Sequence, residues 1–363
     1  METAKGCQGG RSLMTETTTN SGSALETKLE PTAGFSIKAF FRSPAAGAFM
    51  GFVAVFVLFS IFGYDRNFLS VPGMTTWMNF ASIIGMIAIP VGFLMIAGEL
   101  DISTGAVVPA STMTVAIVSQ HYEMPVMVGI AAALAVGALI GFINGFIVTR
   151  TRVPSFIVTL ATLFAVAGIT LYLSIFFINN TNSFYHAPDW AKSLFGGKVF
   201  GFNSSVFWWL GMIAGFIFFL HYSPKGSWVF ALGGDQESAR NAGIPVRKMK
   251  IGLFMLCSTS AAFAGVLQVI TFNSATSQAN FGLIFNTIIS VVVGGVLLTG
   301  GFGTVMGIVF GVLTLSIVTQ AIGFTQIDRN LSFLIIGVML LIAVLLNDTF
   351  RQLATSWSTA KKK

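Results

Sequence analysis

Long runs without charge dominate this chain and limit what it can fold into. No Asp, Glu, Lys or Arg occurs from Ile251 to Ile327, and Arg66 is the only Lys or Arg between Arg42 and Arg150. Only 9% of the residues are charged, whereas a soluble domain has about a quarter. The sequence therefore predicts an all-α, polytopic membrane protein.

The sequence does not indicate nucleic-acid binding, a structural disulfide or a metal site. The net charge of +7 comes from basic residues beside apolar runs, where they set orientation and meet anionic lipid. The bilayer is thus an expected partner and nucleic acid is not. Cys7 and Cys257 occupy a polar tail and an apolar run, so no structural disulfide is expected. No metal site is expected either, because the three histidines fall in separate connections: His121, His186 and His221.

Ten segments have roughly the 20 apolar residues that a membrane crossing needs. They lie near residues 45–63, 75–97, 104–119, 124–148, 154–178, 204–222, 249–271, 284–298, 303–323 and 331–347. Together they form a predicted transmembrane domain over residues 44–348. Residues 1–43 are rich in Ser, Thr and Gly and predict a disordered cytoplasmic tail without a cleavable signal. Residues 349–363 form a predicted cytoplasmic C-terminal tail.

The basic residues give this map an orientation. They gather on one side, which the positive-inside rule makes cytoplasmic: Lys38, Arg42, Arg150, Arg152, the segment 225–250 and Lys361 to Lys363. The opposite connections have weak or balanced charge. We therefore expect a multi-pass protein of the bacterial inner membrane, with both termini in the cytoplasm.

A compact charged element stands out in the cytoplasmic segment 225–250. Asp235 can cap a helix start, Gly243 suits the left-handed residue that ends a helix, and Pro245 prevents the helix from resuming. A single helix of about two turns is predicted at the membrane face, where a soluble partner could hold it. This placement indicates a mechanical role.

Two glycine-rich segments interrupt the apolar runs. One covers residues 98–105 and the other residues 294–303, each next to a short crossing. A weak two-half repeat follows, with Gly137 and Gly141 answering Gly307 and Gly311. Matching interruptions in two halves of a chain indicate a transport pathway. The alternative is that these glycines only make tight turns and bring helices close together.

Glu99 and Asp101 are the only acids from Ala81 to Gln120. They end an apolar helix, so we expect them at the cytoplasmic membrane face, with Asp101 and Ser103 capping the next helix. The alternative is a proton or cation site, since an acid inside a membrane needs a functional reason.

Uncharged polar side chains in the spans are candidates for a translocation path. Asn144, Thr159, Thr162 and Asn286 can hydrogen-bond a neutral polyhydroxylated solute. Polar residues also hold helices together, and that alternative stays open for each of them.

No phosphate-binding G-x-x-x-x-G-K-[ST] motif occurs, so the chain cannot bind ATP in that way. Uphill transport would therefore draw on an ion gradient or on a separate ATPase that holds the charged cytoplasmic helix.

Four motifs resemble those of the permease subunits of ribose-type ABC sugar importers, over about residues 75–347. They are Gly98-Glu99-Leu100-Asp101-Ile102-Ser103-Thr104-Gly105, Val153 to Leu160, Ala231 to Ile244 and Gly294 to Gly303. The chain departs from the family at Glu99, where a second glycine is usual.

The resemblance implies a non-catalytic, ten-helix permease without a cofactor. Its implied partners are a second permease subunit, identical or paralogous, a cytoplasmic ABC ATPase and a periplasmic or lipid-tethered sugar-binding protein. The implied ATPase contact contains Gly234, Asp235, Glu237, Ala239, Arg240 and Gly243. The broken segments contain Gly98, Glu99, Asp101, Gly105, Gly294, Gly295 and Gly300. The competing function is a secondary transporter or facilitator that uses Glu99 and Asp101. The sequence does not identify the sugar.

Overall fold

The computed structural model describes residues 45–325, 328–331 and 333–341. The two predicted tails, residues 1–43 and 349–363, lie outside this part of the chain. The described residues are almost entirely helical, with two short pairs of strands. The predicted all-α class is therefore confirmed.

The main helices follow the predicted apolar segments closely. They are α2 (Ala45–Phe62), α3 (Val71–Ile96), α4 (Thr104–Ala116), α5 (Val126–Arg150), α6 (Ser155–Ile178), α8 (Ser204–Tyr222), α11 (Val246–Phe272), α12 (Phe281–Val293) and α13 (Val305–Ala321). Residues 333–341 are also helical, and the remainder of the last predicted span lies outside the described residues.

Seven helices of the described part are long and apolar enough to cross a membrane. The helix α12 has 13 residues, which gives a length of about 20 Å, too short for a full crossing. The helix α4 also has 13 residues and continues directly into a π-helix of five residues, Ile117–His121. The prediction that these two segments are short is confirmed, whereas the total of ten crossings is not. Each short helix adjoins one of the glycine-rich breaks, as the sequence indicates.

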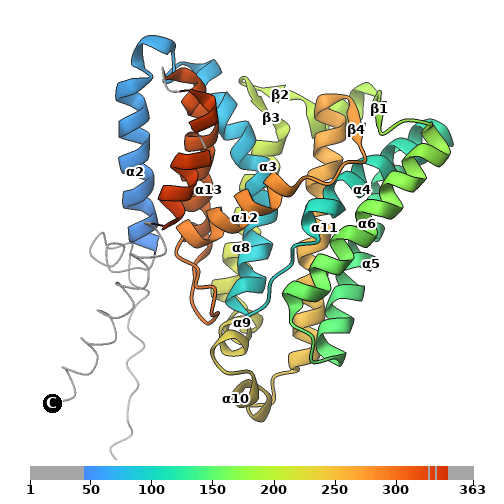
Figure 1. Cartoon of the computed structure of the whole chain (residues 1–363), viewed down its shortest axis with the longest axis vertical. Helices are drawn as coiled ribbons and strands as arrows, with labels where there is room; N and C mark the ends of the chain where they lie inside the picture. Colours follow the sequence, from blue (N-terminus) through green and yellow to red (C-terminus); the bar gives the residue numbers. More distant parts are fainter. Residues whose placement is uncertain (1–44, 326–327, 332, 342–363) are drawn as a thin grey trace, which may run out of the picture.

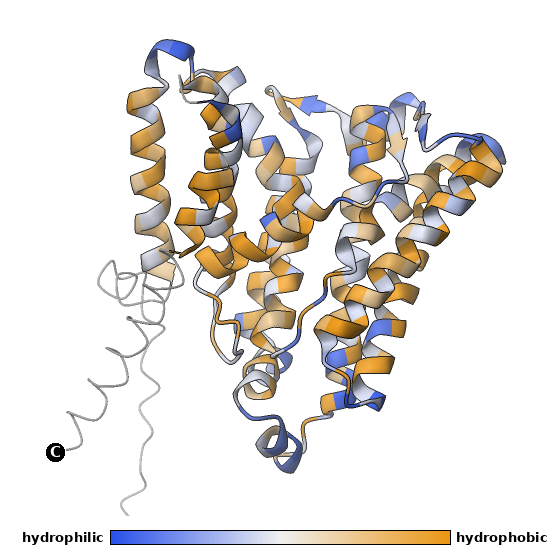
Figure 2. Cartoon of the chain, viewed as in Figure 1, coloured by the Kyte–Doolittle hydropathy of each residue, from blue (hydrophilic) through white to orange (hydrophobic). Residues whose placement is uncertain are grey.

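The helices divide into a central and a peripheral set. In the most apolar stretch of α3, 83% of the residues are buried, and in α11 and α13 the share is 72%. In α2 and α6 it falls to 22% and 28%. The central helices therefore form the core, whereas the outer ones present apolar side chains to the surroundings, as a lipid-facing helix does. Figure 2 shows this apolar belt between hydrophilic ends.

Glycines set the distance between central helices. A Cβ atom on Gly141 would lie 2.5 Å from the carbonyl oxygen of Phe254 in α11, and one on Gly137 would lie 2.8 Å from that of Ser258. Gly307 and Gly311 of α13 are equally close to the backbone of α12. The close-packing role foreseen for these four glycines is confirmed.

The two ends of the molecule carry different small elements (Figure 1). One end holds α7 (Asp189–Ala191) and the antiparallel pairs β1 (Asn182–Phe184) with β4 (Ser274–Thr276) and β2 (Lys198–Val199) with β3 (Phe202–Asn203). The other end holds α9 (Pro224–Gly234) and α10 (Gln236–Asn241). The sequence signals predict α10 but not α9, whose first residue, Pro224, suits a helix start.

Candidate functional site

The exposed helix α10 begins and ends as the sequence predicts. Asp235 caps it, since its Oδ1 accepts hydrogen bonds from the backbone N–H groups of Glu237 at 2.8 Å and Ser238 at 3.1 Å. These bonds, chiefly those from Ser238, hold the pKa of Asp235 below its ordinary value. Gly243 has φ +83°, a conformation that suits glycine and terminates the helix. Both helix signals are confirmed, although α10 has only six residues.

The side chains of α10 fall into two groups. Ala239 is buried at 3% exposure and holds the helix against the body of the protein. Glu237 and Arg240 are exposed, and neither forms an ion pair with any other described residue. A short capped helix with an anchored side and a free charged side presents a rigid surface to a partner.

Three glycine-containing segments meet where α9 leads into α10. The N–H of Gly301 donates to the carbonyl oxygen of Ile96 at 2.8 Å. A Cβ atom on Gly300, which has φ +82°, would lie 3.0 Å both from the carbonyl oxygen of Gly233 and from Cα of Gly98. The two broken segments therefore touch each other and the base of α10, at a place where only glycine backbones fit. We call these residues, Ile96, Gly98, Gly233, Gly300 and Gly301, the glycine junction.

The remaining glycines of the broken segments have separate roles. A Cβ atom on Gly105 would lie 3.0 Å from the carbonyl oxygen of Asn280, just before α12, and one on Gly294 would lie 2.6 Å from that of Gly307 in α13. Gly295 has φ +85° and follows the end of α12. The start of α4 is thus joined to the start of α12, because the carbonyl oxygen of Gly105 accepts the N–H of Asn280 at 3.0 Å.

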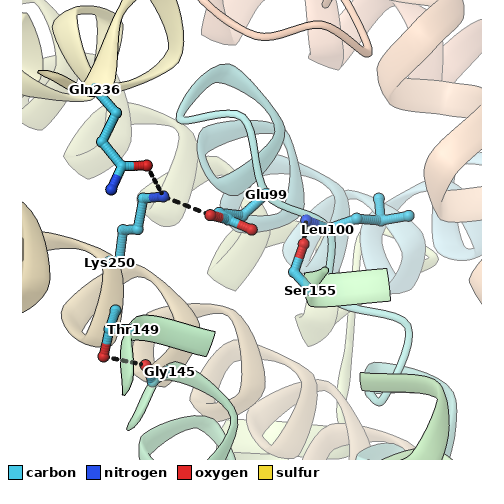
Figure 3. Close-up of polar contacts among 7 residues, drawn as sticks. All are labelled: Glu99, Leu100, Gly145, Thr149, Ser155, Gln236 and Lys250. Atoms are coloured by element: carbon cyan, nitrogen blue, oxygen red, sulfur yellow. Dashed lines mark hydrogen bonds and ion pairs between the residues drawn. The ribbon is translucent and has the colours of Figure 1, made fainter. Parts of the chain in front are cut away.

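Glu99 lies in a network that ties the first break to α10 (Figure 3). Lys250 of α11 donates through Nζ to Oε1 of Glu99 at 2.5 Å and to Oε1 of Gln236 at 2.7 Å. The side chains of Lys250 and Glu99 are only 8% and 12% exposed. The next N–H along the chain, that of Leu100, donates to Oγ of Ser155 at 3.1 Å. Glu99 does not have a positive φ, so the departure from the family's second glycine requires no special backbone conformation.

This network borders a polar cavity of about 320 Å³ beside α10. Four cationic side chains and one acidic side chain line it: Arg152, Arg240, Arg247, Lys250 and Glu99. Among the described residues, the three arginines form no ion pair. Glu99 therefore lies in a strongly electropositive environment.

Asp101 is buried inside the protein at 1% exposure, and its location at the cytoplasmic membrane face stays a prediction. Its Oδ1 accepts from the N–H and the hydroxyl of Ser103, at 2.9 and 2.6 Å, and its Oδ2 accepts from Ser258 at 3.2 Å. These donors replace the water that burial removes. The Ser103 hydroxyl is occupied by Asp101 and does not cap α4.

Three of the four proposed path residues are held by protein contacts. Asn144 is fully buried and donates to the hydroxyl of Ser103 at 2.9 Å, while its Oδ1 has no hydrogen-bond partner among the described residues. Thr159 is fully buried and accepts the N–H of Ile102 at 3.2 Å. Thr162 donates to the carbonyl oxygen of Val158 at 3.0 Å and borders an apolar cavity of about 520 Å³ between α4, α5 and α6. The half-buried Asn286 differs, because its side chain has no hydrogen bond to another described residue.

Sequence reasoning missed the partners that complete these networks. The sequence pattern indicates only an orientation role for Lys250 and no polar pairing for Gln236, Ser155 or Ser258. The Lys250 and Glu99 positions are separated by 151 residues, so no local pattern could pair them. The only available signal was a lysine inside the start of an apolar helix, where a charge needs a partner.

Comparison with known proteins identifies the family. Residues 73–344 match the family described as branched-chain amino acid transport system / permease component. The ribose import permease protein RbsC of Escherichia coli (strain K12) is 30% identical over 304 residues, which cover 82% of this chain and 92% of the relative.

Two further relatives import other sugars, according to their names. The L-arabinose ABC transporter permease protein AraH of Azospirillum brasilense is 31% identical, covering 85% of this chain and 88% of the relative. The fructose import permease protein FrcC of Rhizobium meliloti is 28% identical, covering 86% and 87%. No solved structure matches the chain. With most of its length matched to these permeases, the chain belongs to the family of permease components of ABC transport systems.

Proposed function

We propose that this chain is the membrane-spanning subunit of an importer that moves a sugar, a pentose, hexose or related polyol, into the bacterial cytoplasm. The family membership makes it a non-catalytic permease, with ATP hydrolysis in a separate ATPase. The names of the ribose, arabinose and fructose relatives support a sugar as the solute. The absence of charge from Ile251 to Ile327 is consistent with a neutral solute, which needs hydrogen bonds and no counter-charge.

The ATPase contact, in this proposal, is α10 with the residues around it. The observation that carries this assignment is the combination of a rigid cap at Asp235, free charges at Glu237 and Arg240, and a direct link from Gln236 to Lys250. A rigid element passes on a displacement, whereas a flexible loop would absorb it. Binding of the ATPase to α10 can therefore move the two glycine-rich segments to which α10 is joined.

A complete importer reconstituted in proteoliposomes tests this function. Permease, ATPase and binding protein together should accumulate sugar only when ATP is present on the α10 side. Replacing Arg240 with Glu should weaken copurification of the ATPase, since it reverses an exposed charge on the contact. Retention of the ATPase and of full uptake by Arg240→Glu would contradict the assignment of α10.

The competing function, a secondary transporter that uses Glu99 and Asp101, is not retained. The relatives are named as ABC permeases. In addition, Glu99 is paired with the ammonium group of Lys250, and the carboxylate oxygens of Asp101 accept hydrogen bonds from Ser103 and Ser258, so both acids already have partners within the protein. Purified permease alone in liposomes should show no uptake driven by a proton or sodium gradient.

The other partners follow from the same arrangement. The end with the strand pairs β1–β4 and β2–β3 faces away from α10 (Figure 1), so it is the surface for a periplasmic or lipid-tethered sugar-binding protein. A second permease, identical or paralogous, would complete the importer in the bilayer. In this proposal the bacterial inner membrane surrounds the apolar belt, and the positive-inside rule supports a cytoplasmic location for both termini.

A further inference from the structure

We infer that the ion pair between Glu99 and Lys250, together with Gln236, is a mechanical link that makes the first broken segment follow the position of α10. We call these three residues the relay. This inference rests on the proposed function, since it assumes that the ATPase acts on α10. Its new content is the identity of the side chains that pass the movement on.

The relay joins three elements that are far apart in the sequence. Gln236 is the first residue of α10, Lys250 lies near the start of α11, and Glu99 follows the end of α3. One ammonium group, Nζ of Lys250, donates to both other side chains, at 2.5 and 2.7 Å. A displacement of Gln236 therefore acts directly on the group that holds Glu99.

Burial makes this link stiff. Because Lys250 and Glu99 are almost out of contact with water, neither charge can exchange its partner for solvent without a large cost. A buried ion pair adds little net stability compared with an apolar pair of the same size. Its use here is positional, because an apolar side chain at position 250 could not form the hydrogen bond to Gln236.

Two arginines line the same cavity as Glu99 and are alternative counter-charges for it. Arg240, on α10 itself, and Arg152 line the same cavity as Glu99, and neither forms an ion pair with another described residue. If α10 moves, an arginine can replace Lys250 as the counter-charge of Glu99. In such a second arrangement the charge of Glu99 would again be paired, as a two-state switching element requires.

Movement of Glu99 reaches the transport region through its neighbours in the chain. The N–H of Leu100 is held by Ser155, and the N–H of Ile102 by Thr159, both on α6. Asp101 between them is held by Ser103 and Ser258. A shift at position 99 therefore pulls on a segment that is hydrogen-bonded to two membrane helices.

The test measures sugar uptake and ATP hydrolysis in the reconstituted importer, together with copurification of the ATPase. The variants are Gln236→Ala, Glu99→Gln and Lys250→Met, with Gln236→Glu as the conservative change that keeps an acceptor for Lys250. We expect sugar transported per ATP hydrolysed to fall about tenfold in the first three, an ordinary size for coupling between sites. Gln236→Glu should keep the ratio, and the double variant Glu99→Gln/Lys250→Met should be no worse than either single change.

Lys225→Met is the matched control, because Lys225 is an exposed lysine of α9 outside the relay. It should leave the ratio unchanged. An unchanged ratio in Gln236→Ala, Glu99→Gln and Lys250→Met would overturn the relay. So would a loss of uptake that only tracks the amount of folded permease, since that result indicates a purely structural pair. Failure of the proposed ATPase contact is seen separately, as undiminished copurification of the ATPase with Arg240→Glu.

Discussion

Gly233 lies against the carbonyl oxygen of Ile96 so closely that a Cβ atom at position 233 would overlap it, and would stand 2.5 Å from the backbone nitrogen of Gly301. This contact fixes the end of α9, which leads into α10, against the end of α3 and the second broken segment. Its neighbour Gly234 is different, because a Cβ atom there would meet nothing within 4 Å. Two adjacent glycines thus have opposite tolerance for a side chain.

Gly233→Ala should therefore destabilise the permease by about 1–3 kcal/mol, the usual cost of inserting a methyl group into a tightly packed place. Gly234→Ala should stay within about 0.5 kcal/mol of the parent. Thermal unfolding of the detergent-solubilised permease measures both. Equal midpoints for the two variants would show that the glycine junction tolerates side chains.

Asp235→Ala should weaken ATPase binding because α10 loses its cap, whereas Asp235→Asn should bind almost as well as the parent, since Asn caps helices about equally well. Titration of the ATPase onto permease in nanodiscs provides the comparison. Similar affinities for the Ala and Asn variants would show that ATPase binding does not depend on the helix cap.

The pKa of Asp235 gives this cap a defined pH dependence. Hydrogen bonds from Ser238 and Glu237 lower that pKa below its ordinary value of 3.8. A lowered pKa in the folded state means that the cap stabilises α10 fully above 3.8 and loses this effect as the pH falls through the lower value. ATPase binding should therefore not change with the ionisation of Asp235 around neutral pH. In a pH titration, Asp235→Asn serves as the reference that lacks this ionisation.

Gly243→Val should uncouple ATP hydrolysis from uptake while the permease still inserts. The site has open space around it, so the effect comes from forcing a β-branched residue to φ +83°. Gly252→Ala is the control, because position 252 also has open space and lies inside α11 without a positive φ. Normal sugar uptake by Gly243→Val would mean that the end of α10 does not matter for coupling.

Orientation can be tested with single cysteines and a membrane-impermeant thiol reagent. A cysteine replacing Trp190, which lies in α7 and is 51% exposed, should be labelled from outside intact cells. A cysteine replacing Glu237 on α10 should not. Cys257 is buried and gives little background once Cys7 is replaced by Ser. The reverse labelling pattern would invert the topology and remove the ATPase contact from the cytoplasm.

Asn286→Ala should lower the rate of sugar uptake severalfold, with unchanged sugar affinity of the binding protein, if Asn286 lines the path. Asn144→Ala should instead destabilise the permease by about 1 kcal/mol, the typical contribution of one hydrogen bond, because Asn144 bonds to Ser103. The uptake kinetics of Thr159→Ala and Thr162→Ala are measured in the same way. Unaltered uptake kinetics in all four correctly assembled variants would leave helix packing as their only role.

The sequence by itself determined the parts of this protein that depend on local chemistry. Charge-free runs required membrane helices, and the pair Asp235 and Gly243 set the start and end of α10 through bonds within a few residues. The glycines at 98–105 and 294–303 marked the two breaks, because glycine permits turns and close approaches that other residues do not. The cap and glycine signals act over one or two helical turns, and the charge-free runs act within single helices.

Only the tertiary structure decided which of these parts meet. It paired Glu99 with Lys250 across 151 residues, buried Asp101 among the hydroxyls of Ser103 and Ser258, and placed Gly233 against Ile96. The physical reason is that burial and pairing of a polar group depend on which helices pack around it. That packing is a property of the whole chain, and a local pattern of residues does not contain it.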